Sequence, residues 1–179
     1  MKILLTHLFI FLFASMFSQP NMKWNTHTPA RMEDLVSFIP NGFRLLNSFA
    51  ADLNEDSLLD QLILIADTAT QKQALIILIR EKNKTLKVAA RNDNVTSSDI
   101  TVSKGSVTVS YYTHQGGGKN TLKVIFKYST NKKDWLLFQR VLIFTSDTPT
   151  ASGGYDDITT ETKTAKDFGE IRFEAFMED

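Results

Sequence analysis

Four oxygen-bearing side chains recur within one nine-residue stretch at a spacing that suits a bound metal ion. Residues 52–60 read Asp-Leu-Asn-Glu-Asp-Ser-Leu-Leu-Asp, with Asp52, Asn54, Asp56 and Asp60 at positions one, three, five and nine. Calcium is a hard cation that binds about six to eight oxygen atoms from carboxylates, amides, backbone carbonyls and water. The spacing therefore predicts one calcium site in this loop.

The predicted ligands are five residues of this loop. Asp52, Asn54 and Asp56 would contribute side-chain oxygens. Leu58, at position seven, would contribute its backbone carbonyl, and Asp60 a carboxylate that binds directly or through water. The carboxylates would repel one another, and a divalent ion would offset that repulsion. The alternative interpretation is an acidic surface turn that binds no metal.

The loop resembles the DxDxDGxxD calcium turn of FG-GAP-type propeller blades, dockerins and related exported bacterial domains, which implies the same five ligands. Ser57 stands where that motif has a glycine for a left-handed backbone, and Ile63 where an EF-hand has a bidentate glutamate. A single copy of the turn argues against a propeller, which needs several similar blades. The wider frame, from residues 39–46 through the loop to residues 90–93, is similar to a group of uncharacterised secreted bacterial proteins and implies no known activity.

No other residues form a convincing active site. Outside residues 1–19 the only histidines are His27 and His114, too few for a histidine-based zinc site, and no GxSxG motif accompanies them. Glycines 116–118 lack the continuation of a phosphate-binding loop, which favours a hairpin loop. Four aromatic residues could form a platform for sugar rings or fill cross-strand pairs: Tyr111, Tyr112, Tyr128 and Trp135.

Residues 1–19 have the composition of an export signal. Lys2 precedes an apolar run, and small residues then offer cleavage before or just after Gln19. The apolar run is short for a membrane span, and an uncleaved anchor is the alternative. The chain has no cysteine, which excludes disulfides and lipid attachment to a cysteine. We therefore expect a secreted or periplasmic protein that is not a lipoprotein and has no membrane span in its mature chain.

The charge balance of the mature chain argues against nucleic-acid binding. Removal of the signal would leave 19 basic and 20 acidic residues, because Lys2 is the only charged residue removed from the 20 basic and 20 acidic residues of the whole chain. Nucleic-acid-binding domains normally have a basic excess. After a flexible lead-in over residues 20–31, residues 32–179 have the size of a single domain, and we expect that domain to be rich in β-structure.

The first half of the chain predicts one short helix and several strands. The helix is expected over residues 31–38 and a strand over 43–50, directly before the acidic loop. Near-continuous apolar runs at 62–66 and 74–80 indicate central strands that are covered on both faces. A helix over residues 71–80 is the alternative for the second run, and its cluster of isoleucines favours the strand.

The second half predicts an antiparallel meander and a long polar loop. Residues 91–99 are polar and indicate a loop, and residues 145–167 are predicted as a long polar loop. Strands are predicted at 86–90, 100–103, 106–113, 122–128, 135–144 and 169–176. The fold class predicted is mainly β, an antiparallel sheet or sandwich, with α+β as the alternative.

The sequence thus predicts a secreted, non-catalytic, calcium-binding β domain that acts as a binding or envelope-accessory protein, with an unknown protein or glycan partner. One alternative is a hydrolase or carbohydrate-active protein whose paired carboxylates only folding brings together. Another is a secreted inhibitor or adhesion protein that presents the loop over residues 145–167.

Overall fold

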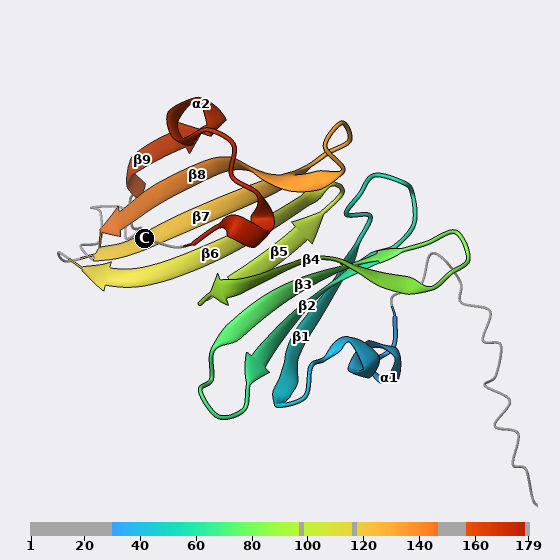
Figure 1. Cartoon of the computed structure of the whole chain (residues 1–179). Coiled ribbons are helices and arrows are strands. Elements are labelled where there is room, and N and C mark those ends of the chain that lie inside the picture. Colours follow the sequence, from blue (N-terminus) through green and yellow to red (C-terminus); the bar gives the residue numbers. More distant parts are fainter. Residues whose placement is uncertain (1–29, 97–98, 116–117, 147–156, 178–179) are drawn as a thin grey trace, which may run out of the picture.

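The structure is a computed structural model that describes residues 30–96, 99–115, 118–146 and 157–177 (Figure 1). The predicted signal and nearly all of the lead-in lie outside these residues. The strands are β1 (Phe43–Ala51), β2 (Asp60–Asp67), β3 (Gln73–Arg80), β4 (Leu86–Val95), β5 (Asp99–Ser103), β6 (Ser106–Gln115), β7 (Gly118–Ser129), β8 (Asp134–Ser146) and β9 (Asp157–Thr164). The helical elements are α1 (Met32–Leu35), α2 (Ala165–Phe168) and the 3₁₀ turns η1 (Val36–Phe38) and η2 (Phe173–Ala175).

Two antiparallel sheets follow each other along the chain. The first contains four strands in the order β1-β2-β3-β4, and the second contains five in the order β5-β6-β7-β8-β9. Each strand pairs with its neighbour in sequence, so both sheets are meanders built from short-range connections. The mainly β fold class is confirmed, and the helix expected over residues 31–38 corresponds to α1 and η1.

The central strands β2 and β3 are buried on both faces, as their apolar runs predict. Leu62 and Ile63 are adjacent in β2 and therefore point to opposite faces, and both are fully buried. The face that contains Ile63 is covered by the helical turn at the start of the domain, through Leu35. The other face packs against the second sheet, and both sheets thereby share one hydrophobic core.

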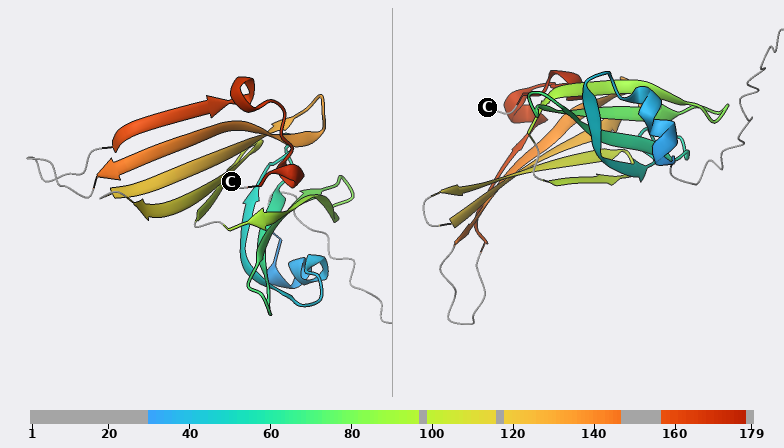
Figure 2. Two further views of the ribbon diagram at one scale, coloured as in Figure 1. Left: turned by 60° about the vertical axis from the view of Figure 1, so that its left-hand side comes forward. Right: turned by 90° about the horizontal axis from the view of Figure 1, so that it is seen from below.

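The core between the sheets is closed by the end of the chain. Phe173 and Phe176, in and after η2, are buried there, and each meets the Phe126 ring of β7 edge-on, with ring centroids 5.1 and 5.4 Å apart. The five-stranded sheet continues well beyond this core, toward the β6–β7 and β8–β9 connections (Figures 1 and 2).

The loop predicted over residues 91–99 is wrong over most of its length. β4 continues to Val95, and β5 begins at Asp99. The polar residue Asn92 is almost fully buried, and its side-chain amide donates hydrogen bonds to the backbone carbonyls of Phe173 and Phe176 at 2.5 and 3.0 Å. A polar side chain here completes the hydrogen bonds of a distant segment, which a local pattern cannot reveal.

The long loop predicted over residues 145–167 is also wrong in part. Residues 157–164 form β9 against β8, and α2 follows; residues 147–156 lie outside the described residues. Threonine is β-branched and favours strands when a partner strand is present. The Thr-rich composition of this segment therefore suits an edge strand as well as a loop.

The strand predicted over residues 169–176 is not formed. This segment makes one isolated bridge, between Arg172 and Leu136, and then the 3₁₀ turn η2. A 3₁₀ turn has about three residues per turn, which places Phe173 and Phe176 on the same side and buries both. The alternation of apolar residues over 169–176 predicted a strand, but the two residues that are buried, Phe173 and Phe176, are three positions apart.

None of the helices in the described ranges has the length and apolar character needed to cross a bilayer.

We predict that Asn92→Asp lowers the free energy of unfolding by about 2–4 kcal/mol at neutral pH. The carboxylate would lose both donors and would face two backbone carbonyl oxygens inside the core. Urea denaturation measures the change. Asn94→Asp, two residues along the same strand at an exposed position, is the matched control and should change stability by less than about 0.5 kcal/mol. Equal effects of the two substitutions would contradict the role assigned to Asn92.

Candidate metal site

The acidic loop connects β1 to β2 at the junction of the two sheets (Figure 1). The backbone N–H of Gly105, in the β5–β6 turn, donates to the Asp52 carbonyl at 2.8 Å. The Trp135 indole N–H, from β8, donates to the Leu53 carbonyl at 2.9 Å, and the Leu53 side chain is fully buried in the shared core. The loop is therefore held by both sheets.

Two residues of the loop have a left-handed backbone. Glu55 has a φ of 61° and Ser57 a φ of 69°. Ser57 occupies the position where the calcium turn has a glycine, so the loop adopts the glycine-like conformation without the glycine. Such a conformation costs a non-glycine residue of order 1 kcal/mol, and it persists where the surroundings determine the backbone.

The three predicted side-chain ligands of the first half of the loop accept hydrogen bonds from its own backbone. Asp52 Oδ2 accepts from the Ser57 N–H at 3.1 Å, and Asn54 Oδ1 accepts from the Asp56 N–H at 3.2 Å. Asp56 Oδ1 accepts from the Leu58 N–H at 2.8 Å. Through these bonds the loop backbone turns around the three side chains that the sequence predicts as ligands.

Asp52 has one oxygen atom without a hydrogen-bond donor. Its Oδ1 is buried and has no partner, whereas its Oδ2 accepts from Ser57 and lies 3.5 Å from Lys104 Nζ. A buried, anionic oxygen without a donor is costly, because it loses hydration and gains nothing in exchange. A cation in the loop would remove that cost.

Asp60, the predicted ligand at position nine, is fully buried and anchors the loop to β3. Its Oδ2 accepts from the Leu53 N–H at 2.8 Å, and its Oδ1 accepts from the Arg80 N–H at 2.7 Å. Burial raises the pKa of the Asp60 carboxyl from 3.8 to about 6; these N–H groups oppose the rise, and the negative charge of Asp56 adds to it. The Asp60 carboxylate thus has a structural role that the sequence analysis missed.

Arg80 is the second residue that the sequence analysis missed. It is 2 % exposed, and its Nε donates to the Leu59 carbonyl at 2.8 Å, which links the end of β3 to the end of the loop. Burial lowers the pKa of the Arg80 guanidinium, and the negative charges of Asp60 and Asp34 oppose that change. A charged residue at the end of the apolar run 74–80 is the signal that could have identified it.

The five predicted ligands lie in one short loop, but their charged side chains do not converge on a single point. Within the described residues, no three Asp, Glu, His or Cys side chains form a group that could hold a metal ion. The negative charge of the loop also acts on Tyr128 in the second sheet. The pKa of the Tyr128 hydroxyl is raised, mainly by burial and secondly by the charge of Asp56. Amide and backbone oxygens would have to complete a cation site.

The other candidate residues form no site that the structure supports. His114 is exposed in β6, whereas His27 lies outside the described residues. Tyr111 and Trp135 belong to the core, and Tyr128 packs on the Trp135 ring with centroids 4.9 Å apart, which is the cross-strand alternative to a sugar platform. Of the four, only Tyr112 is exposed, and Lys119 Nζ lies 3.9 Å from the centre of its ring.

A hollow of about 500 Å³ beside α1 is lined by two acids, Glu33 and Asp34, and by Arg80. Asp34 Oδ2 accepts from the Arg31 N–H at 3.0 Å, which explains Asp34 as a residue that caps α1. The hydrolase alternative gains no support from this arrangement.

Comparison of the chain with protein-family models, with curated proteins and with solved structures gives no match.

We predict that the metal-free protein gains about 1 kcal/mol of stability between pH 7 and pH 5 through Asp60. A folded-state pKa of about 6 lies above the unfolded value, so the folded protein takes up this proton first. The contribution is complete below about pH 4 and is lost as the pH rises through 6. Urea denaturation in metal-free buffer at several pH values measures the slope.

Asp60→Asn is the variant that isolates the contribution of Asp60 to the pH dependence of stability. It should be less stable than the parent protein at pH 7, because its amide group would face a backbone N–H donor, and its stability should lack the Asp60 part of the slope between pH 5 and 7. The same pH slope in both proteins would show that Asp60 does not titrate in this range.

Proposed function

We propose that this protein is an exported, non-catalytic domain whose β1–β2 loop binds one calcium ion, and that the ion stabilises a surface for an unidentified protein or glycan. The observation that carries the calcium proposal is the buried Asp52 Oδ1, which has no hydrogen-bond donor in a loop with three aspartates. The left-handed backbone at Ser57 supports it, because the calcium turn needs that conformation at this position.

The ion would be held by oxygen atoms of the loop itself. Asp52, Asn54 and Asp56 would supply side-chain oxygens, and Leu58 would supply its backbone carbonyl. Asp60 accepts two backbone hydrogen bonds, so it would bind the ion through a remaining lone pair or through water. Bound calcium supplies positive charge that offsets the repulsion among the carboxylates.

A structural role for the ion fits the position of the loop better than a catalytic one. The loop is tied to the β5–β6 turn through Asp52 and to β8 through Leu53, and the hollow beside α1 is lined by other residues. With a dissociation constant of about 0.1 mM in a millimolar-calcium medium, binding would add roughly 1.4 kcal/mol. The ion would therefore stabilise a fold that forms without it.

Lys104 is the competing counter-charge. Its Nζ lies 3.5 Å from Asp52 Oδ2, but its side chain is 64 % exposed, so the pair is weak. If Lys104 rather than calcium balances the loop, Lys104→Gln will destabilise the protein and calcium will not restore it. If calcium is the ligand, Lys104→Gln will strengthen the response to calcium.

We predict that calcium at about 1 mM raises the melting temperature by about 3–6 °C relative to EDTA, as expected for roughly 1.4 kcal/mol in a domain of this size. Asp52→Asn keeps the shape of the side chain, removes its charge and should remove most of this shift. Differential scanning calorimetry measures the shift, and titration calorimetry measures the binding heat.

Glu55→Gln is the matched control for charge. Glu55 is an exposed acid of the same loop and is not a proposed ligand, so this variant should keep the calcium response. A protein that melts at the same temperature in calcium and in EDTA, with no binding heat, would refute the calcium proposal.

Export is tested separately. The full chain, expressed in a bacterium, should appear outside the cytoplasm with an N-terminus at Gln19 or Pro20, as intact-mass spectrometry of the periplasm and medium would show. Phe11→Arg places a charge in the apolar run and should leave the unprocessed chain in the cell. Recovery of the parent chain from the cytoplasm at full length would refute export.

A further inference from the structure

β9 is an edge strand with one free side. It pairs with β8 on one side, and among the described residues no strand lies on the other. Residues 160–163 are exposed and Thr164 is half-buried. An uncovered edge presents backbone N–H and C=O groups that can pair with another strand.

The sequence of this strand is complementary to itself. Residues 160–164 read Thr-Glu-Thr-Lys-Thr, with Thr162 at the centre. In an antiparallel pair of identical strands centred on Thr162, Glu161 of each copy faces Lys163 of the other. Thr162 then faces its own equivalent, and Thr160 faces Thr164. Opposite charges and Thr–Thr pairs are both favourable when directly opposed across antiparallel strands.

We propose that two copies of this chain associate through β9, antiparallel and centred on Thr162, so that two five-stranded sheets join into one continuous sheet. The interface is isologous, because the same edge serves both copies around a two-fold axis. This inference is independent of calcium binding.

The charges also select the register. A shift of the pairing by two residues places Glu161 opposite Glu161 in one direction, or Lys163 opposite Lys163 in the other. Like charges directly opposed destabilise a strand pair, so these neighbouring registers are disfavoured. A shift by one residue would place each charge opposite a threonine and forfeit both ion pairs.

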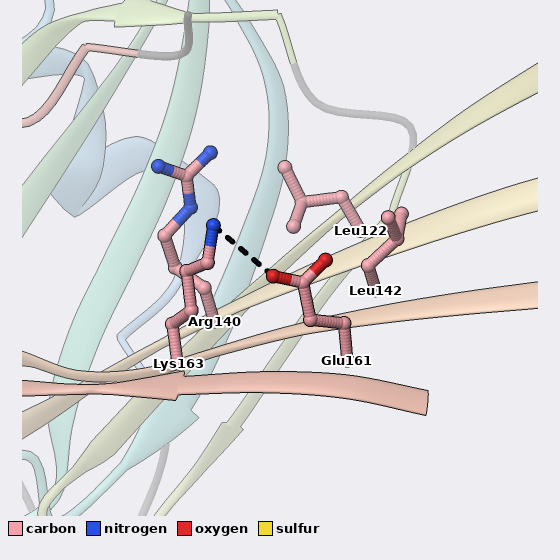
Figure 3. A pocket seen from close by; sticks show the side chains of 5 residues that line it. All are labelled: Leu122, Arg140, Leu142, Glu161 and Lys163. Carbon is pink, nitrogen blue, oxygen red and sulfur yellow. Dashed lines mark ion pairs between the residues drawn. The ribbon is translucent and has the colours of Figure 1, made fainter. Parts of the chain in front are cut away.

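The side chains around this edge are placed for contact with a second copy. Glu161 and Lys163 pair in register with Leu142 and Arg140 of β8, so the four lie on one face of the sheet. Together with Leu122 they line a shallow hollow of about 290 Å³ (Figure 3). Lys163 Nζ lies 3.1 Å from Glu161 Oε1 within the same strand, and both side chains are more than half exposed, so each can also reach across the two-fold axis.

A second copy is the occupant that the sequence favours. Glu161 and Lys163 lie on either side of Thr162, so each charge faces its opposite when two copies of the strand pair. Pairing with an unrelated strand would not require this arrangement. The other edge strands have contacts that β9 lacks: the β5–β6 turn donates through Gly105 to Asp52 at the end of β1, and β4 packs on η2 through Asn92.

The test is a charge swap followed by sedimentation velocity on the purified protein at about 1–200 µM, a range that brackets micromolar dissociation constants. The parent protein should shift from monomer to dimer over this range. Glu161→Lys and Lys163→Glu should each weaken dimerisation about tenfold or more, because each substitution acts twice in a two-fold interface. Both side chains are exposed, so melting temperatures measured at monomeric concentrations should change little.

Two combinations make the test specific. An equimolar mixture of the Glu161→Lys and Lys163→Glu proteins should form a heterodimer, because every facing pair is again of opposite charge. The double variant should form a homodimer at parental affinity. A parent protein that stays monomeric, single variants that dimerise normally, or a mixture that fails to associate would each overturn the proposal and leave this edge to another chain or to solvent.

Discussion

The carboxylate of Asp60 is the buried interaction on which the first sheet and the acidic loop both depend. It binds the backbone N–H of Leu53 in the loop and that of Arg80 at the end of β3, so one side chain joins three segments. Leu53 in turn inserts into the core and accepts the indole hydrogen bond of Trp135 from the second sheet. The Asp60 carboxylate therefore links β3, through the loop, to β8, in addition to the core that the two sheets share.

That arrangement has an electrostatic cost, which a bound cation would reduce. A fully buried carboxylate loses its hydration, and two N–H donors offset only part of this loss, so the pKa of Asp60 rises to about 6. The buried and unpartnered oxygen of Asp52 adds a second uncompensated acceptor in the same turn. Additional positive charge near the loop would favour the ionised form of Asp60 and would give the buried Asp52 oxygen a partner; calcium is the proposed source. Lys104 provides only a weak, exposed alternative.

The sequence was sufficient for features that depend on local patterns. The apolar runs of β2 and β3 predicted strands buried on both faces, and the strands predicted at 100–103 and 106–113 correspond to β5 and β6. It was insufficient where a distant partner decides the outcome. The sequence suggests a loop at Asn92, but its side chain is buried because it donates hydrogen bonds to the Phe173 and Phe176 carbonyls. It also suggests a loop at residues 157–164, but these residues form a strand because they pair with β8.

The candidate site shows the same division. The spacing of Asp52, Asn54 and Asp56 predicted side-chain ligands for one ion, which stays a prediction; in the structure each of the three accepts a hydrogen bond from a backbone N–H of the same loop. The spacing could not show that Asp60 binds backbone groups, because the donor at Arg80 lies 20 residues away and carries no side-chain signature. The resemblance, in contrast, did point to a left-handed backbone at position 57, where the motif has a glycine, and Ser57 adopts that conformation with a φ of 69°.

The two ends of the second sheet are stabilised by different means. Near the loop, the strands of this sheet share a core with the first sheet. In the half of β8 beyond Gln139, apolar residues remain partly exposed on both faces of the sheet, such as Leu142 on one face and Ile143 on the other. A sheet that extends beyond its core cannot rely on face packing for its stability. It must rely on hydrogen bonds between strands and on whatever pairs with its edge. The self-complementary sequence of β9 lies at that edge, where an additional strand would add the most.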